Sequence, residues 1–254
     1  MNKEELEKKV KNHSTNRMNI AVVGMPQSGT TALYNIVNFI LRLNHFKVKN
    51  ALYHPTVMHN NVINEEYLRT YTGDEILIVK EHHFIPFLCN EWSDIIFVSK
   101  RDIRDSIASR LRRGKTLISK GKMKSVEHTY DANSPQAFQR WCEYLTDDCF
   151  KHWVESAEQN KRKILPIDYV EFKTNPRSVI KLIYGQLKEF HNNLRLDEDK
   201  VLDAINNLHR YDEKTTFFSP SKITNSGEIG SFKNNLSQEE IKYINQNFKE
   251  WINE

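Results

Sequence analysis

At 254 residues, the chain is long enough for one domain with a sizeable core, or for two small ones at most. Hydrophobic residues make up 39% of the chain and charged residues 28%, an ordinary balance for a soluble protein. The net charge of +4, from 37 basic and 33 acidic residues, is too small to indicate a nucleic-acid-binding protein by itself.

The sequence shows no sign of export or of membrane insertion. Residues 1–17 are polar and charged, without the apolar core of a signal peptide, and no apolar run reaches membrane-spanning length. Cys89, Cys142 and Cys149 are odd in number and lack CxxC or zinc spacing. We therefore expect a cytoplasmic protein with reduced thiols and no membrane association, in which a polar N-terminal segment precedes a single domain over residues 18–254.

Short aliphatic runs predict the strands of a buried parallel sheet. Each run is rich in Ile, Val and Leu and is bounded by polar residues, as buried parallel strands are. The predicted strands are Ile20–Val23, Ile76–Val79, Ile95–Ser99 and Ile164–Tyr169.

Amphipathic patterns between these runs predict helices. Two starts carry capping signals: Ser134, which is followed by Pro135, and Ser237, which opens a capping-box pattern. The predicted helices cover residues 3–13, Thr31–Leu43, Asp102–Leu111, a long segment from Ser134 through Trp153, Arg177–Phe190 and a last segment from Ser237. Strands that alternate with helices predict an α/β fold with a central parallel sheet flanked by helices on both sides.

The segment from Gly24 to Thr31 has the pattern of a phosphate-binding loop. It follows the first strand and opens a helix, which aims backbone N–H groups and the positive end of the helix at an anion. The spacing from Gly24 to Gly29 is that of a Walker A loop, but Thr30 stands where that motif has the lysine that reaches the β- and γ-phosphates. The loop is therefore suited to an anion other than ATP or GTP.

A second anion site is predicted where the strand Ile95–Ser99 meets the next helix. Lys100 and Arg101 come directly before a helix whose N-cap is Asp102, and cations have the wrong sign for that helix end unless an anion lies there too. Ser109 lies about two turns further along the same side of the helix, where its hydroxyl can reach the anion that Arg101 holds. The alternative is a solvated basic strand end with an incidental serine.

The strand Ile76–Val79 ends in Lys80-Glu81-His82-His83. His82 is well placed there for proton transfer, because the pKa of histidine lies near neutrality. For an isolated histidine, a surface or structural role is the better interpretation. The position of His82 beside two predicted anion sites favours proton transfer.

Two polar stretches interrupt the order of strands and helices. Tyr53–Gly73 is rich in His, Asn and Tyr, and Arg110–Lys124 holds seven basic residues and no acidic one. Loops at the carboxyl ends of strands build the sites of open α/β sheets. We interpret the basic stretch as a mobile lid, since it lacks the interleaved aromatic residues of a single-strand nucleic-acid site.

Together these motifs resemble those of the sulfotransferases that use 3'-phosphoadenosine 5'-phosphosulfate (PAPS). The segment Pro26–Thr31 resembles the family's 5'-phosphosulfate loop, and Lys80-Glu81-His82 resembles the segment that carries its catalytic base. Three further matches follow in the family's order: Arg101 with Ser109 for the 3'-phosphate, Asp168–Phe172 for the segment whose tyrosine contacts the nucleotide, and Gly227–Asn234 for the closing segment.

The resemblance implies a P-loop-like three-layer fold and transfer of a sulfuryl group from PAPS to a hydroxyl or amine, leaving adenosine 3',5'-bisphosphate (PAP). It implies catalytic roles for His82, Lys80 and Gln27. The residues it implies in donor binding are Gln27, Ser28, Gly29, Thr30, Thr31, Arg101, Ser109, Tyr169, Ser226 and Gly227. No metal is expected, and the polar stretch Tyr53–Gly73 favours a small polar acceptor.

The chain departs from the family pattern at three places. Gln27 stands where the family has a lysine, Ala32 where it has an aromatic residue that stacks on adenine, and Asn225-Ser226 where it has Arg-Lys. We hypothesise that Lys80 takes over part of the role of the missing lysine.

Two other classes of function remain open. One is a P-loop kinase, against which the missing lysine argues. The other is an inert protein that binds PAP, or a nucleic-acid-binding module that uses Arg110–Lys124. The preferred partner is a small-molecule acceptor, with no nucleic acid and no membrane.

Overall fold

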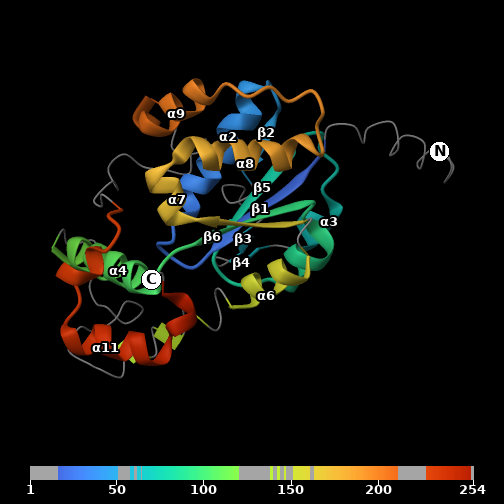
Figure 1. Ribbon diagram of the computed structural model, residues 1–254. Helices are drawn as coiled ribbons and strands as arrows, with labels where there is room; N and C mark the ends of the chain where they lie inside the picture. The colour runs from blue at the N-terminus through green and yellow to red at the C-terminus, as the bar shows by residue number, and fades with distance from the viewer. Residues whose placement is uncertain are drawn as a thin grey trace, which may run out of the picture.

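The computed structural model describes residues 17–50, 58–59, 62–63, 65–119, 138–139, 142–143, 146, 151–160, 163–210 and 227–252. Within these ranges, five parallel strands form the central sheet in the order β2-β5-β1-β6-β7 (Figure 1). The strands are β1 (Asn19–Gly24), β2 (Val48–Asn50), β5 (Ile76–Glu81), β6 (Ile95–Lys100) and β7 (Ile164–Asp168). The sequence-based expectation of a central parallel sheet is confirmed.

Side chains alternate across the sheet, so each face carries its own apolar cluster. On β1, Ile20 and Val22 pack into one cluster, whereas Ala21 and Val23 pack into the other. All four side chains are fully buried, as expected for a parallel sheet that is covered on both faces.

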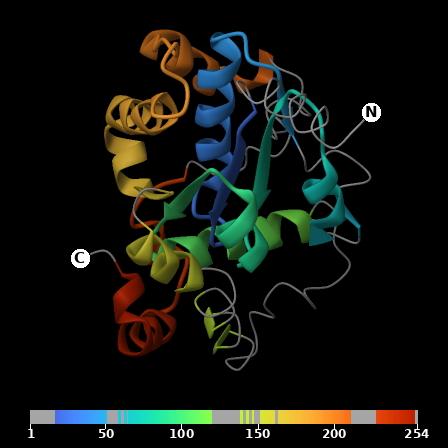
Figure 2. The ribbon, with the colours of Figure 1, turned by 90° about the vertical axis from the view of Figure 1, so that its right-hand side faces the viewer.

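Helices cover both faces and make the three layers that the sequence predicts. One face carries α2 (Thr30–Leu43), α8 (Pro176–Lys188) and α9 (Glu198–Asn206), which supply Leu33, Val179 and Val201 to the shared cluster. The other face carries α3 (Glu65–Thr70), α4 (Ile103–Ser119), α6 (His152–Gln159) and α11 (Gln238–Asn247). Figure 2 shows α9 (orange) and the C-terminal elements (red) at opposite ends of the molecule.

Short elements complete the described chain. The strands β3 (Met58–His59) and β4 (Val62–Ile63) pair to form a separate two-stranded antiparallel sheet. The short helices are α7 (Tyr169–Thr174), the π-helical turn η2 (Leu88–Trp92) and the 3-10 turns η4 (Leu208–Arg210), η6 (Ser231–Asn234) and η7 (Lys249–Trp251). None of the helices in these described ranges is long and apolar enough to cross a bilayer.

The four predicted strands are confirmed, although β1, β5 and β6 extend one or two residues beyond their predicted bounds, and the end of the last strand is corrected. We expected Tyr169 in the last strand, but β7 ends at Asp168 and Tyr169 begins α7. The Asp168 carboxylate accepts a hydrogen bond from the backbone N–H of Val170 at 2.6 Å and caps this short helix. The cap turns the chain, so that Tyr169 faces the phosphate loop instead of continuing the strand.

The helix predictions are confirmed at α2, α8 and α11, and α4 is longer than expected. It was predicted to end at Leu111 but continues to Ser119, so residues 112–119 of the basic stretch are helical and do not form the loop that we expected. Residues 120–124 and 3–13 lie outside the described residues, as does most of the long helix predicted from Ser134. Trp153, which we placed in that helix, belongs to α6.

The last predicted helix begins with the capping box that its sequence indicates. The Ser237 hydroxyl accepts a hydrogen bond from the Glu240 N–H at 3.2 Å, and the Glu240 carboxylate accepts one from the Ser237 N–H at 2.7 Å. The two bonds satisfy N–H groups that the first turn of a helix otherwise leaves unpaired.

We predict that Ser237→Ala lowers the free energy of unfolding by about 1 kcal/mol, because it removes one of the two reciprocal bonds. Urea unfolding followed by circular dichroism measures the change. Lys242→Ala, on the exposed side of the same helix, is the control and should leave the unfolding midpoint in place. Equal midpoints for Ser237→Ala and the native protein would contradict the account of this cap.

Candidate active site at the carboxyl ends of the central strands

The phosphate loop lies between β1 and α2 in a conformation that depends on Gly29. Gly29 is the N-cap of α2 with φ of 97°, and a Cβ atom there would lie 2.5 Å from the Tyr169 ring. Residues with a Cβ atom rarely adopt this conformation, and the nearby Tyr169 ring leaves no room for a side chain at this position. The first turn of α2 has no side-chain cap and no acidic residue. Its backbone N–H groups are therefore available to an anion.

Ser99 of β6 fixes the backbone of the loop. Its hydroxyl donates a hydrogen bond to the Ser28 carbonyl at 2.5 Å. The Ser28 side chain is fully buried, and its hydroxyl has no hydrogen-bond partner among the residues that the structure describes. A buried hydroxyl without a partner is costly, and a ligand oxygen in the loop would satisfy it.

Arg101, the first residue after β6, joins the loop to the rest of the site. Its guanidinium donates hydrogen bonds to the carbonyls of Gln27 at 2.8 Å and Glu228 at 3.2 Å, and lies 4.3 Å above the Tyr169 ring. The residue is only 5% exposed, and its buried Nε has no hydrogen-bond partner within the described part of the chain. Burial lowers the pKa of Arg101 below its usual range.

The partners of Arg101 leave its charge open to a ligand. Among the described residues, its hydrogen bonds go to backbone carbonyls and to no carboxylate. A buried cation that lacks a bonded counter-ion is costly, so an anion at this position would stabilise it. The alternative of a solvated strand end is wrong for Arg101, because this residue is only 5% exposed.

Ser109 reaches the loop from the second turn of α4. Its hydroxyl donates a hydrogen bond to the side-chain oxygen of Gln27 at 3.4 Å, and the residue is 3% exposed. Gln27 adopts a positive φ of 69° and is contacted through its carbonyl by Arg101 and through its side chain by Ser109. The two predicted anion motifs thus meet at one loop residue.

The geometry of His82 assigns its tautomer. Its Nδ1 lies 2.7 Å from the Gly24 carbonyl. A carbonyl accepts only, so Nδ1 carries the proton and donates. Its Nε2, 3.4 Å from Lys80 Nζ, then presents a lone pair. A neutral ring with this lone pair can take a proton from a substrate, and the Gly24 carbonyl ties the ring to the start of the phosphate loop.

Electrostatics keep this ring neutral. Burial, and then the neighbouring Lys80 charge, lowers the pKa of His82 to about 3, although the Gly24 hydrogen bond acts in the opposite direction. The unfolded chain binds the proton near pH 6.5. Above this pH, the protonation of His82 does not affect the free energy of unfolding. As the pH falls from about 6.5 to about 3, protonation of His82 in the unfolded chain progressively lowers the free energy of unfolding.

Glu81 holds the turn that carries the histidines, a role that the sequence analysis missed. Its carboxylate accepts hydrogen bonds from the backbone N–H groups of His82 at 2.7 Å and His83 at 3.2 Å. Glu81 is 9% exposed at the end of β5. The sequence offered one signal for this role, namely an acidic residue at the end of an apolar strand. A buried carboxylate needs hydrogen-bond donors close by, and the backbone N–H groups of the following turn are the nearest ones.

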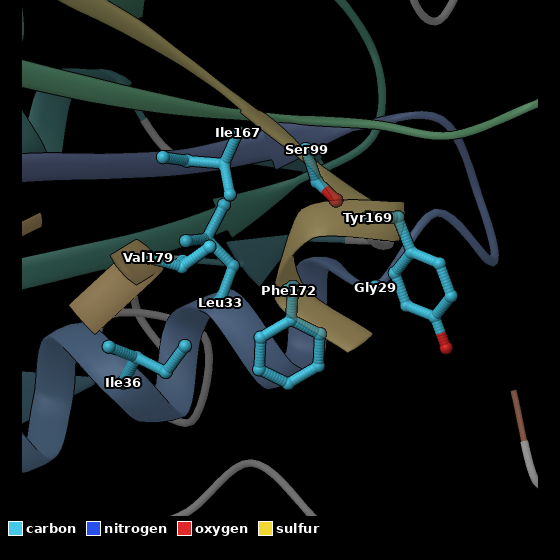
Figure 3. Close-up of a pocket in the computed structure, with 8 residues that line it drawn as sticks. All are labelled: Gly29, Leu33, Ile36, Ser99, Ile167, Tyr169, Phe172 and Val179. Atoms are coloured by element: carbon cyan, nitrogen blue, oxygen red, sulfur yellow. The ribbon is translucent and has the colours of Figure 1, made fainter. Parts of the chain in front are cut away.

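Tyr169 and Phe172 of α7 border a small apolar cavity beside the loop (Figure 3). Leu33 and Ile36 of α2 line its opposite side. The Tyr169 hydroxyl donates a hydrogen bond to the Gly227 carbonyl at 3.1 Å. This bond brings the closing segment to the same site.

The structure gathers the predicted site residues that it describes at one edge of the sheet. Most of them follow the ends of β1, β5, β6 and β7, which is where open α/β sheets bind ligands, whereas Ser109 comes from α4 and Gly227 from the closing segment. Ser226 lies outside the described residues, as do Cys149 and Asn225. Within the described ranges, no group of three or more His, Cys, Asp or Glu side chains could hold a metal ion.

A comparison with protein families identifies the class of this fold and site. The profile of the Sulfotransferase domain matches residues 17–254. The chain belongs to this family and is a PAPS-dependent sulfotransferase. A sequence search of curated proteins finds no match.

Three solved structures share the fold of this chain at low sequence identity. The chain is similar to mouse sulfotransferase SULT7A1 complexed with PAP, with a TM-score of 0.62, 16% identity, and coverage of 99% of this chain and 90% of that one. It is also similar to retinol dehydratase in a complex with retinol and PAP, with a TM-score of 0.59, 12% identity, and coverage of 98% and 85%. A second structure of retinol dehydratase, with androsterone and PAP, gives a TM-score of 0.57 at 13% identity over 91% and 80%.

We predict that Lys80→Met raises the pKa of His82 from about 3, because it removes a positive charge beside the ring. Burial remains, so the pKa should stay below 6.5. NMR titration of the His82 ring protons measures the shift. Lys49→Met removes a cation that stacks on Tyr71 instead, and it should leave the His82 titration unchanged. An unchanged curve in Lys80→Met would contradict the assigned contact.

Proposed function

We propose that the protein transfers a sulfuryl group from PAPS to a hydroxyl or amine of a small, polar acceptor and releases PAP. The observation that carries this proposal is the hydrogen bond from Arg101 to Gln27, which joins an arginine without a bonded carboxylate to a phosphate-type loop. PAPS carries a 5'-phosphosulfate and a separate 3'-phosphate. It therefore needs two neighbouring anion sites and not one triphosphate cradle.

The described residues divide between these two anions. Gln27, Ser28, Gly29, Thr30 and Thr31 would bind the 5'-phosphosulfate through the loop and the N-terminus of α2. Two orphaned atoms support a bound anion, the Ser28 hydroxyl in the loop and Nε of the arginine that follows β6.

Arg101 and Ser109 would bind the 3'-phosphate, with a charge-assisted bond from the guanidinium. Tyr169 would contact the nucleotide, because its ring lies against Arg101 and Gly29, whereas Ala32 offers no ring to stack on. Ser226 and Gly227 of the closing segment complete the proposed donor site.

The residues at the end of β5 would carry the chemistry. The acceptor oxygen or nitrogen forms a bond to sulfur, the bond from sulfur to the 5'-phosphate oxygen breaks, and His82 Nε2 takes the acceptor proton. Lys80, Gln27 and the N–H groups of the loop stabilise the charge on the sulfuryl group and on the leaving phosphate. The tautomer fixed by the Gly24 carbonyl supports His82 as the base.

The relatives and the composition of the chain support proposals for the type of acceptor and for the cellular location. The solved retinol dehydratase structures hold retinol and androsterone, which supports a small-molecule acceptor for this chain. The polar composition of Tyr53–Gly73 favours a polar one. We further propose a cytoplasmic protein with a polar segment over residues 1–17, a single domain over 18–254 and no metal requirement.

An inert PAP-binding protein is the second candidate, and Gln27 is the observation that favours it. An amide brings no charge to the leaving oxygen, and charge-assisted hydrogen bonds are roughly twice as strong as neutral ones. Such a protein would be stabilised by PAP and would not turn over PAPS. A P-loop kinase is disfavoured, because Thr30 stands at the position of the Walker lysine.

We expect mass spectrometry of reactions with PAPS and a panel of hydroxylated and amino metabolites to show the mass gain of one sulfuryl group. His82→Ala should lower kcat by about 10²-fold or more, because it removes the proton acceptor. Binding of PAP should persist in that variant and serves as its control. Near-native turnover by His82→Ala would refute the assignment of the base. PAP binding without turnover in the native protein would favour the inert binder.

We expect Lys80→Ala to lower kcat by about 10²-fold, as loss of a charge-stabilising donor does in other enzymes. Adding Gln27→Lys to this variant should restore part of the rate, because an ammonium then faces the leaving phosphate. Lys49→Ala is the control and should leave kcat unchanged. The idea that Lys80 replaces the loop lysine would fail if turnover by Lys80→Ala equalled that of the native enzyme.

A further inference from the structure

The carboxylate of Asp105 holds three consecutive residues of the C-terminal segment. Asp105 lies in the first turn of α4 and is 3% exposed. One of its oxygens accepts a hydrogen bond from the Gly230 N–H at 2.8 Å. The other accepts from the Ser231 hydroxyl and the Phe232 N–H, both at 3.1 Å. One buried side chain thus fixes a backbone segment that is more than a hundred residues away in the sequence.

The other end of the same segment contacts the donor site. The Gly227 carbonyl accepts a hydrogen bond from the Tyr169 hydroxyl at 3.1 Å, and the Glu228 carbonyl accepts one from Arg101 at 3.2 Å. The segment 227–232 therefore spans from Asp105 to the guanidinium that would bind the 3'-phosphate.

A second contact docks this segment on α4 independently of Asp105. The Arg104 guanidinium lies 4.3 Å above the Phe232 ring and donates a hydrogen bond to the Asn245 side chain at 3.2 Å. An ion pair between Arg104 Nη2 and Asp102 Oδ2, 2.6 Å apart, holds the guanidinium in this orientation. Because this contact holds the Phe232 side chain, Asp105 is not needed to attach the segment. What Asp105 adds is the position of the backbone at residues 230–232.

The conformation of Gly230 is consistent with a role of Asp105 in positioning the backbone of residues 230–232. Gly230 has φ of 75° and is the N-cap of η6, which has no side-chain cap of its own. The N–H groups at the start of η6 are consequently directed at Asp105. The segment thus supplies three of the roughly four hydrogen bonds that a carboxylate can accept.

We propose that Asp105 is a positioning residue of the donor site. It sets where the backbone of residues 227–232 lies and, through the Glu228 carbonyl, how the Arg101 guanidinium is oriented toward the 3'-phosphate. This inference rests on the proposed function. It assigns donor affinity to a side chain that does not itself touch the donor.

Asp105→Asn tests the proposal, because it keeps the size of the side chain but directs an NH₂ group at an N–H donor. Titration calorimetry with PAP should show affinity lower by about tenfold or more, as expected when a buried donor loses its acceptor. The kcat at saturating PAPS should change by less than about threefold, since remote positioning of the donor acts on binding. This split between affinity and kcat separates positioning from a general loss of structure.

Two further variants keep the test decisive. Ser231→Ala removes one of the three donors and keeps both backbone bonds, so it should weaken PAP binding by a smaller factor, about threefold, even if Asp105→Asn does not fold. Glu240→Gln weakens the cap of α11 in the same C-terminal region, away from residues 227–232. It should lower the melting temperature without changing PAP affinity.

The outcomes separate this inference from the function on which it rests. Absence of PAP binding by the native protein would refute the proposed function itself. Native binding of PAP, with unchanged affinity in Ser231→Ala and in a folded Asp105→Asn, would overturn only the role of Asp105. A lower melting temperature or a lower kcat at unchanged PAP affinity would also overturn it.

Discussion

The guanidinium of Arg101 is the interaction on which the rest of the site depends. It links the phosphate loop through the Gln27 carbonyl and the closing segment through the Glu228 carbonyl, and it stacks on Tyr169. A buried cation that is bonded only to neutral carbonyls is costly. Three segments far apart in sequence are oriented around this cation, and in the proposed function its charge binds a ligand anion.

The parallel sheet explains why these segments meet. All five strands run in one direction, so the loop after β1, the histidine turn after β5, Arg101 after β6 and Tyr169 after β7 emerge at the same edge. Backbone carbonyls then make the connections: the Gly24 carbonyl orients His82, and the Gln27 carbonyl orients Arg101. The loop thus positions His82 and Arg101. In the proposed reaction it would also bind the donor anion, which couples donor binding to proton transfer.

Local signals predict much of this arrangement, and non-local contacts account for what was missed. Aliphatic runs and the Ser237 capping box are local, and they predict the strands and the last helix. The Asp168 cap is also local, but it directly follows the aliphatic run that predicts the last strand. Tyr169 was therefore assigned to that strand, although it begins α7. The three-residue strand β2 is too short for a pattern. The contact of Asp105 with residues 230–232 joins positions more than a hundred residues apart, which one sequence does not reveal.

The central claim is that Arg101 and the phosphate loop form two separate anion sites for one adenosine bisphosphate. Titration calorimetry with PAP and with adenosine 5'-monophosphate, which lacks only the 3'-phosphate, tests it directly. The account predicts that PAP binds about 100-fold more tightly, because two hydrogen bonds to a charged phosphate are lost with the 3'-group. Equal affinity for the two nucleotides, or tight binding of magnesium ATP with none of PAP, would contradict it.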